Sequence, residues 1–127
     1  MDKDVRNWVE VSAYDKDTAE AMYKAGRYLY VMFMCQQAVE KMLKGLVMQE
    51  TGKFPPKTHD LNKLVTLCNI ELDGPQIELV SDLTTYYIET RYPEDIRRMS
   101  AEIDKRLAET YLKDTKEFLK WLKARIR

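Results

Sequence analysis

The 127-residue chain is poor in the residues that break helices and make turns, with only four glycines and four prolines. A many-stranded sandwich or barrel needs more turn residues than this, and the apolar content of 45% is too high for a disordered chain. The length suits one compact domain. We therefore expect a single all-α domain over residues 1–127.

The sequence also lacks an excess of charge of one sign, since 21 Lys and Arg balance 21 Asp and Glu. No global positive field exists to hold nucleic acid or an anionic membrane. No stretch approaches the roughly 20 apolar residues that cross a bilayer, and the N-terminus, MDKDVRNWVEV, lacks the pattern of a secretion signal. We expect no membrane association and a cytoplasmic location.

Metal-binding and nucleophilic residue types are scarce as well. Cys35 and Cys68 lie far apart in apolar patterns without a CxxC motif, so we interpret both as core thiols. His59 is the single histidine, which excludes a His-based metal site or a histidine dyad within one chain. The sequence also has no phosphate-binding glycine loop, HExxH or GxSxG motif. We predict no metal and no cofactor.

Apolar periodicity and stop signals predict about five helices in an up-and-down antiparallel bundle, with long second and last helices. The second helix has the widest apolar stripe and should be central. We assign Thr58 and Ser100 as N-caps of the third and last helices. The apolar spacing of the fourth helix comes from Ile77, Val80, Leu83 and Tyr87. The expected helices cover about residues 5–25, 28–51, 58–68, 75–92 and 100–126.

The last predicted helix belongs to a locally basic segment. Residues 97–127 hold ten basic residues against five acidic ones. Aromatic residues that would stack on bases are not interleaved on its polar side, so we interpret it as a solvated face rather than an RNA-binding strip.

Two polar features stand out from the apolar pattern. Glu40 precedes Lys44 by four residues, the favoured order for a helical ion pair, which is usually a solvated stabiliser. Arg91 follows Tyr87 by one turn and directly precedes Tyr92-Pro93. An arginine there can bind a phosphate or carboxylate, although pairing with a neighbouring acid such as Glu94 explains it equally well.

The ordered motifs resemble the HEPN domain, a helical module found in prokaryotes beside or fused to nucleotidyltransferases. The resemblance lies in the QQAVEKMLK run at 36–44, THDL at 58–61 and TRYP at 90–93, with Trp8 and Asp15 in the first helix. It implies an antiparallel helical bundle, commonly a homodimer, with a role tied to nucleotides or RNA. A toxin-antitoxin-like or defence module with a separately encoded minimal nucleotidyltransferase would fit this role.

Many HEPN proteins are similar to toxin ribonucleases in which a histidine follows an arginine by four to six residues. Here Asp95, Ile96 and Arg97 occupy those positions after Arg91, and no histidine follows. Arginine cannot act as the base that ribonuclease chemistry needs. A nucleotide- or RNA-associated binding or regulatory subunit is therefore favoured over a ribonuclease toxin and over a structural dimeric module without ligand.

The resemblance groups the candidate ligand-binding residues, for a nucleotide or a phosphate. We expect Arg91 to bind phosphate, Lys44 to add a point charge and Tyr92 to stack on a base, with Glu40 and Asp60 orienting the cations. The same residues can instead form a buried polar network that fixes helix packing. The candidate set is Glu40, Lys44, His59, Asp60, Arg91 and Tyr92.

Overall fold

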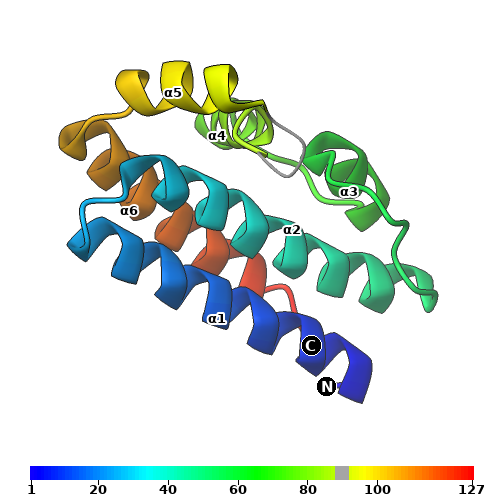
Figure 1. Ribbon diagram of the computed structural model, residues 1–127. Helices are drawn as coiled ribbons and strands as arrows, with labels where there is room; N and C mark the ends of the chain where they lie inside the picture. Colours follow the sequence, from blue (N-terminus) through cyan, green and yellow to red (C-terminus); the bar gives the residue numbers. More distant parts are fainter. Residues whose placement is uncertain (88–91) are drawn as a thin grey trace.

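The structure is a computed structural model that describes residues 1–87 and 92–127, and its described residues are helical without any strand (Figure 1). The all-α class is confirmed, with long second and last helices of 24 and 19 residues. A sixth helix is present beyond the five expected. The helices are α1 (Lys3–Lys24), α2 (Tyr28–Thr51), α3 (Leu61–Cys68), α4 (Gly74–Thr84), α5 (Pro93–Glu102) and α6 (Lys105–Lys123).

Glycines end the first two helical segments where the sequence predicts. Gly26, in the turn between α1 and α2, has a φ of 74°, and Gly52, the C-cap of α2, has a φ of 70°. Both values lie in the left-handed region, where glycine avoids the strain that a Cβ would cause. The bounds of α2 therefore match the prediction.

The predicted helix starts at Thr58 and Ser100 are wrong. Asp60 caps α3 by accepting a hydrogen bond from the Asn62 amide, and Asp104 caps α6 by accepting one from the Leu107 amide. Ser100 lies inside α5. An additional helix, α5, starts at Pro93, a residue favoured in the first helical turn, and it includes Ser100. The helix expected up to residue 92 ends earlier, at Thr84.

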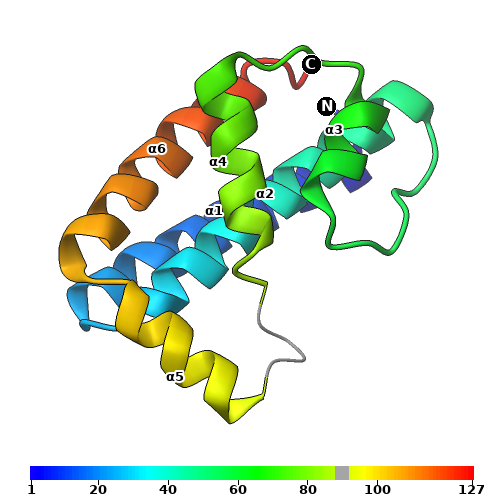
Figure 2. The ribbon, with the colours of Figure 1, turned by 90° about the horizontal axis from the view of Figure 1, so that it is seen from above.

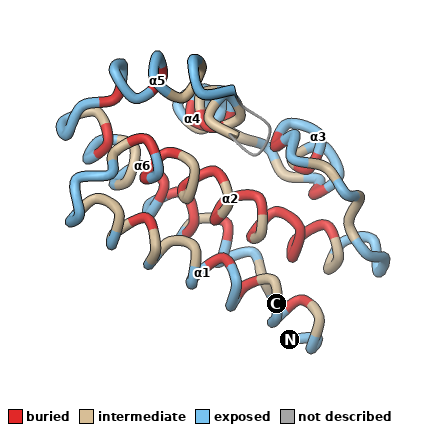
Figure 3. The backbone as a smooth tube through the Cα atoms, viewed as in Figure 1, coloured by how far each residue is buried: buried red, intermediate tan, exposed pale blue. Residues whose placement is uncertain are grey.

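Helix α2 is central to the fold. Figures 1 and 2 show α1 and α6 on one side of it and α3, α4 and α5 on the other. Fourteen of its 24 residues are buried, and Figure 3 shows the buried positions concentrated along it. Its fully buried apolar residues are Val31, Met32, Cys35, Ala38, Val39 and Leu43.

Helix α4 crosses over this layer and buries only a narrow face. Leu79, Val80 and Leu83 are buried, whereas Ile77, which belongs to the apolar spacing of the predicted helix, is 54% exposed. Ile77, Val80 and Leu83 follow one another at a spacing of three, but only one side of α4 meets α2 and α6 (Figure 2). No helix in the described part of the chain is long and apolar enough to cross a membrane.

Gly45 allows α1 and α2 to approach closely. A Cβ at this position would lie 3.2 Å from the Cβ of Trp8 and 3.7 Å from the carbonyl oxygen of Val5. A side chain there would separate the two helices along their main interface. By contrast, a Cβ at Gly74, the first residue of α4, would meet no atom within 4 Å.

We expect Gly45→Leu to lower the free energy of unfolding by about 1–3 kcal/mol or more, because overpacking a filled interface forces backbone shifts. Gly74→Leu is the matched control and should change stability by less than about 0.5 kcal/mol. Urea unfolding followed by circular dichroism measures both. Equal stability of the two variants would contradict the close packing of α1 on α2.

Candidate functional site

The carboxylate of Glu40 lies inside the protein on α2, where only 1% of the residue is exposed. It accepts hydrogen bonds from Gln36 Nε2 at 3.1 Å and from Lys44 Nζ at 3.0 Å, both one turn away on the same helix. Its third partner is His59 Nδ1, at 2.9 Å, from the segment before α3. The carboxylate therefore joins two elements that are distant in sequence.

These partners determine the charge state of Glu40. Burial alone would raise its pKa, but hydrogen bonds from His59, Gln36 and Lys44, together with the charge of Lys44, outweigh burial and hold the pKa below its ordinary value. Glu40 is thus a carboxylate at neutral pH.

His59 lies between Glu40 and Tyr87. Because the carboxylate can only accept, Nδ1 of His59 carries the proton that Glu40 binds. In the neutral ring Nε2 is then an acceptor, facing the Tyr87 hydroxyl at 2.8 Å. The His59 and Tyr87 rings stack with centroids 3.9 Å apart, and Phe33 lies 5.9 Å from Tyr87. The His59 side chain remains 47% exposed.

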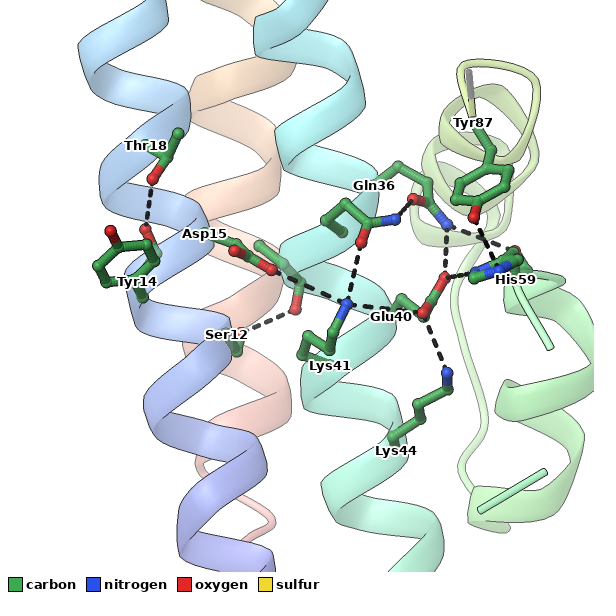
Figure 4. A network of polar contacts seen from close by, with 12 residues as sticks. Ser12, Tyr14, Asp15, Thr18, Gln36, Glu40, Lys41, Lys44, His59 and Tyr87 are labelled. Carbon is green, nitrogen blue, oxygen red and sulfur yellow. Dashed lines mark hydrogen bonds and ion pairs between the residues drawn. The ribbon is translucent and has the colours of Figure 1, made fainter. Parts of the chain in front are cut away.

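The polar network continues across α2 to α1 (Figure 4). Lys41 Nζ lies 2.9 Å from Gln37 Oε1, 3.7 Å from Glu40 and 3.9 Å from Asp15. Burial raises the pKa of Asp15, with Lys41 acting in the opposite direction and Glu40 adding to the rise. The polar contacts therefore extend from His59, in the segment before α3, through α2 to Asp15 on α1.

Three of the six predicted site residues come together, namely Glu40, Lys44 and His59. Asp60 is exposed, and its carboxylate caps α3 instead of contacting the cations. Tyr92 is the N-cap residue of α5 and is 77% exposed. Arg91 lies outside the described residues.

The sequence reasoning missed other members of the network. Gln36 has the same four-residue spacing to Glu40 that revealed Lys44, so the QQAVEKMLK run contained the signal for it. Asp15 and Tyr87 reach the network from other helical segments, and no local spacing connects them to Glu40.

The model of the HEPN domain family matches residues 5–125. The chain belongs to the HEPN family. This confirms the resemblance seen in the QQAVEKMLK, THDL and TRYP motifs. No curated protein matches the sequence at a significant level.

Solved structures share this HEPN fold. The crystal structure of TT1696 from Thermus thermophilus matches with a TM-score of 0.80 and 25% identity, over 94% of this chain and 96% of the other. The structure of ST0689, an archaeal HEPN homologue, matches with a TM-score of 0.76 and 21% identity over the full length of both chains. The second likeness concerns the fold alone.

The thiols of this HEPN domain are unsuited to chemistry. Cys35 and Cys68 are buried, as predicted, and burial raises the pKa of each thiol to about 12. Within the described ranges no group of three or more His, Cys, Asp or Glu side chains is arranged to hold a metal. The Glu40 network reaches the surface at His59, whose side chain is 47% exposed.

We expect Glu40→Gln to lower the free energy of unfolding at pH 7 by about 3–5 kcal/mol, because it leaves the Lys44 ammonium without its buried counter-charge. The folded-state pKa of Glu40 is depressed, so its contribution is present above the ordinary value of 4.5 and is lost as the pH falls through the folded pKa. In urea unfolding, the difference in the free energy of unfolding between wild type and Glu40→Gln should become smaller below about pH 4.5.

Glu117→Gln, on the exposed surface of α6, is the matched control and should behave as wild type throughout. Asp15 acts with the opposite sign, because its raised pKa makes its ionisation unfavourable in the fold and its protonation at low pH relieves that cost. The difference in the free energy of unfolding between wild type and Glu40→Gln could instead stay constant from about pH 7 down to the acid range. That result would show that the Glu40 charge does not stabilise the network.

Proposed function

We propose that this HEPN domain is a nucleotide- or RNA-binding regulatory subunit that acts with a separately encoded minimal nucleotidyltransferase, in a toxin-antitoxin-like or defence module. Family membership supports this class of function. The observation that carries the proposal is the exposed His59 ring, held by the buried Glu40 carboxylate and stacked on Tyr87. Such a preorganised polar and aromatic edge suits a ligand with phosphates and a base.

The roles of the candidate residues follow from their burial. Only 10% of the Lys44 side chain is exposed, and its ammonium lies 3.0 Å from Glu40 and 5.7 Å from the centre of the Trp8 ring. In the proposal, Lys44 therefore fixes Glu40 and does not contact the ligand directly. Asp60 fixes the start of α3 and with it the neighbouring His59.

The direct ligand contacts in the proposal come from the TRYP motif, whereas His59, whose ring nitrogens face Glu40 and the Tyr87 hydroxyl, positions Tyr87. Arg91 follows Tyr87 by four residues and precedes Tyr92, whose side chain is exposed for stacking on a base. A guanidinium binds a phosphate through two parallel hydrogen bonds, which a lysine cannot do. The proposal accordingly gives the phosphate to Arg91 and the base to Tyr92.

We expect isothermal titration calorimetry to detect binding of ATP, of another nucleotide or of a short RNA to the wild type. Arg91→Ala should weaken that binding at least about tenfold, because it removes a charge-assisted phosphate contact. Tyr92→Ala should weaken it by about 1–3 kcal/mol through lost stacking. Arg98→Ala is the matched control, since Arg98 is exposed and pairs with Asp95 at 3.1 Å.

Two outcomes would contradict this proposal. If the wild type binds none of these ligands while Arg91→Ala loses stability, the network is structural. If purified protein cleaves RNA and Arg91→Ala abolishes the cleavage, the chain is a ribonuclease, although no histidine follows Arg91.

The proposed subunit is a homodimer, as is common among HEPN domains. Several large apolar side chains are exposed, among them Tyr14, Tyr30, Phe54 and Ile77, and a second copy would cover part of this surface. Light scattering at micromolar concentration should give about 30 kDa, twice the chain mass of 15.0 kDa. A mass of one chain would contradict the dimer.

A further inference from the structure

The basic residues of α6 are not spread evenly around the helix. Lys116, Lys120 and Lys123 lie on the side that faces α1, where Lys16 faces them across a groove. Among the described residues, no acidic side chain lines this groove. Three of the basic residues near the end of the sequence therefore share one surface with Lys16.

The uncharged lining of the groove, its floor, is mainly aliphatic. It includes Val9 and Ala13 of α1, Met42 of α2 and Leu119 of α6, with a cavity volume of about 300 Å³. The polar residue in this lining is the buried Ser12, whose hydroxyl donates to the Ala38 carbonyl at 2.7 Å. Both walls extend for two helical turns, about 10 Å by the rise of 1.5 Å per residue. The hydrocarbon stems of the lysines add to the apolar surface, with their ammonium groups at the rim.

The rim is only partly neutralised by the protein itself. Lys116 pairs with Glu20 at 3.1 Å, and Lys16 lies 3.7 Å from the exposed Asp17. Lys120 and Lys123 make no ion pair with any described residue. Lysines one turn apart on a helix, such as Lys116 and Lys120, repel each other, and an anionic partner would remove that cost.

We propose that this lysine-rimmed groove docks an acidic amphipathic helix of a partner protein. Apolar residues on one face of such a helix would contact the aliphatic floor, and flanking Asp and Glu would pair with the lysines. The bound helix would lie between α1 and α6, over Met42 of α2, and would complete a four-helix arrangement. The proposal rests on the regulatory-subunit part of the proposed function, because it supplies a surface for the partner.

The chemistry of the floor favours a protein helix over a nucleic acid. Proteins that hold single strands combine basic grooves with aromatic rings on which bases stack. No aromatic side chain is present among the described residues that line the groove. An aliphatic floor between cationic rims instead matches the alternation of apolar and acidic faces on a helix.

The probe is a synthetic peptide of about 16 residues, or four turns, with leucine on one helical face and glutamate elsewhere. We expect the wild type to bind it, with affinity falling as salt rises. Lys120→Glu with Lys123→Glu should weaken binding at least about tenfold. Lys105→Glu with Lys113→Glu, at exposed positions of α6 outside the groove, changes the net charge equally and should alter binding less than about twofold.

Five outcomes would overturn the groove proposal. Four of them are no binding by the wild type, equal losses in the two double variants, equal binding of a peptide with the same composition but scrambled leucines, and tighter binding of short RNA that the groove variant, Lys120→Glu with Lys123→Glu, loses. Dimerisation lost only in the groove variant would make a second copy the occupant and would also overturn it.

The calorimetric and peptide experiments separate the two proposals. If Arg91→Ala weakens nucleotide or RNA binding and the groove variant retains it, the ligand site is upheld, whether or not the peptide binds. Peptide binding that Arg91→Ala retains would uphold the groove if the nucleotide site failed.

Discussion

The arrangement of α2 and α3 depends on the burial of one carboxylate, that of Glu40. A buried charge is costly unless ion pairs and hydrogen bonds compensate it. Two of its compensating groups, from Gln36 and Lys44, are local, but the third comes from His59, so the cost is met only when the start of α3 is in place. Gln36 strengthens this link, because its amide also donates to the His59 carbonyl at 3.3 Å.

Helix α2 must therefore satisfy two kinds of neighbour at once. Its apolar residues meet the core on several sides, and Gly45 leaves out a side chain at a position where Trp8 of α1 lies close. A further strip of α2, formed by Gln36, Glu40 and Lys44, is also buried but is polar. A polar strip inside a core specifies which segment packs on it, because an apolar or mismatched neighbour would leave the charges without partners.

Local signals made much of the fold predictable. The bounds of α2 followed from two glycines and the Glu40–Lys44 pair from a spacing of four, because these effects act within a few residues. The caps at Thr58 and Ser100 were wrong because Ser, Thr and Asp all cap helices and nearby candidates competed. The stacking of Tyr87 on His59 joins residues 28 positions apart, and no local pattern contains it.

The central place of α2 also constrains how the two proposed surfaces can influence each other. Met42 lies on the floor of the lysine-rimmed groove, whereas Glu40, two residues earlier, faces His59. A partner in the groove and a ligand at His59 would thus contact, directly or through one hydrogen bond, the same turn of one helix. Coupling between binding sites is reciprocal, so a partner that shifts this turn to tighten ligand binding must itself be bound more tightly when the ligand is present. Because this turn is packed and hydrogen-bonded on both sides, such coupling requires a second discrete arrangement of the Glu40 network rather than a gradual bend of α2.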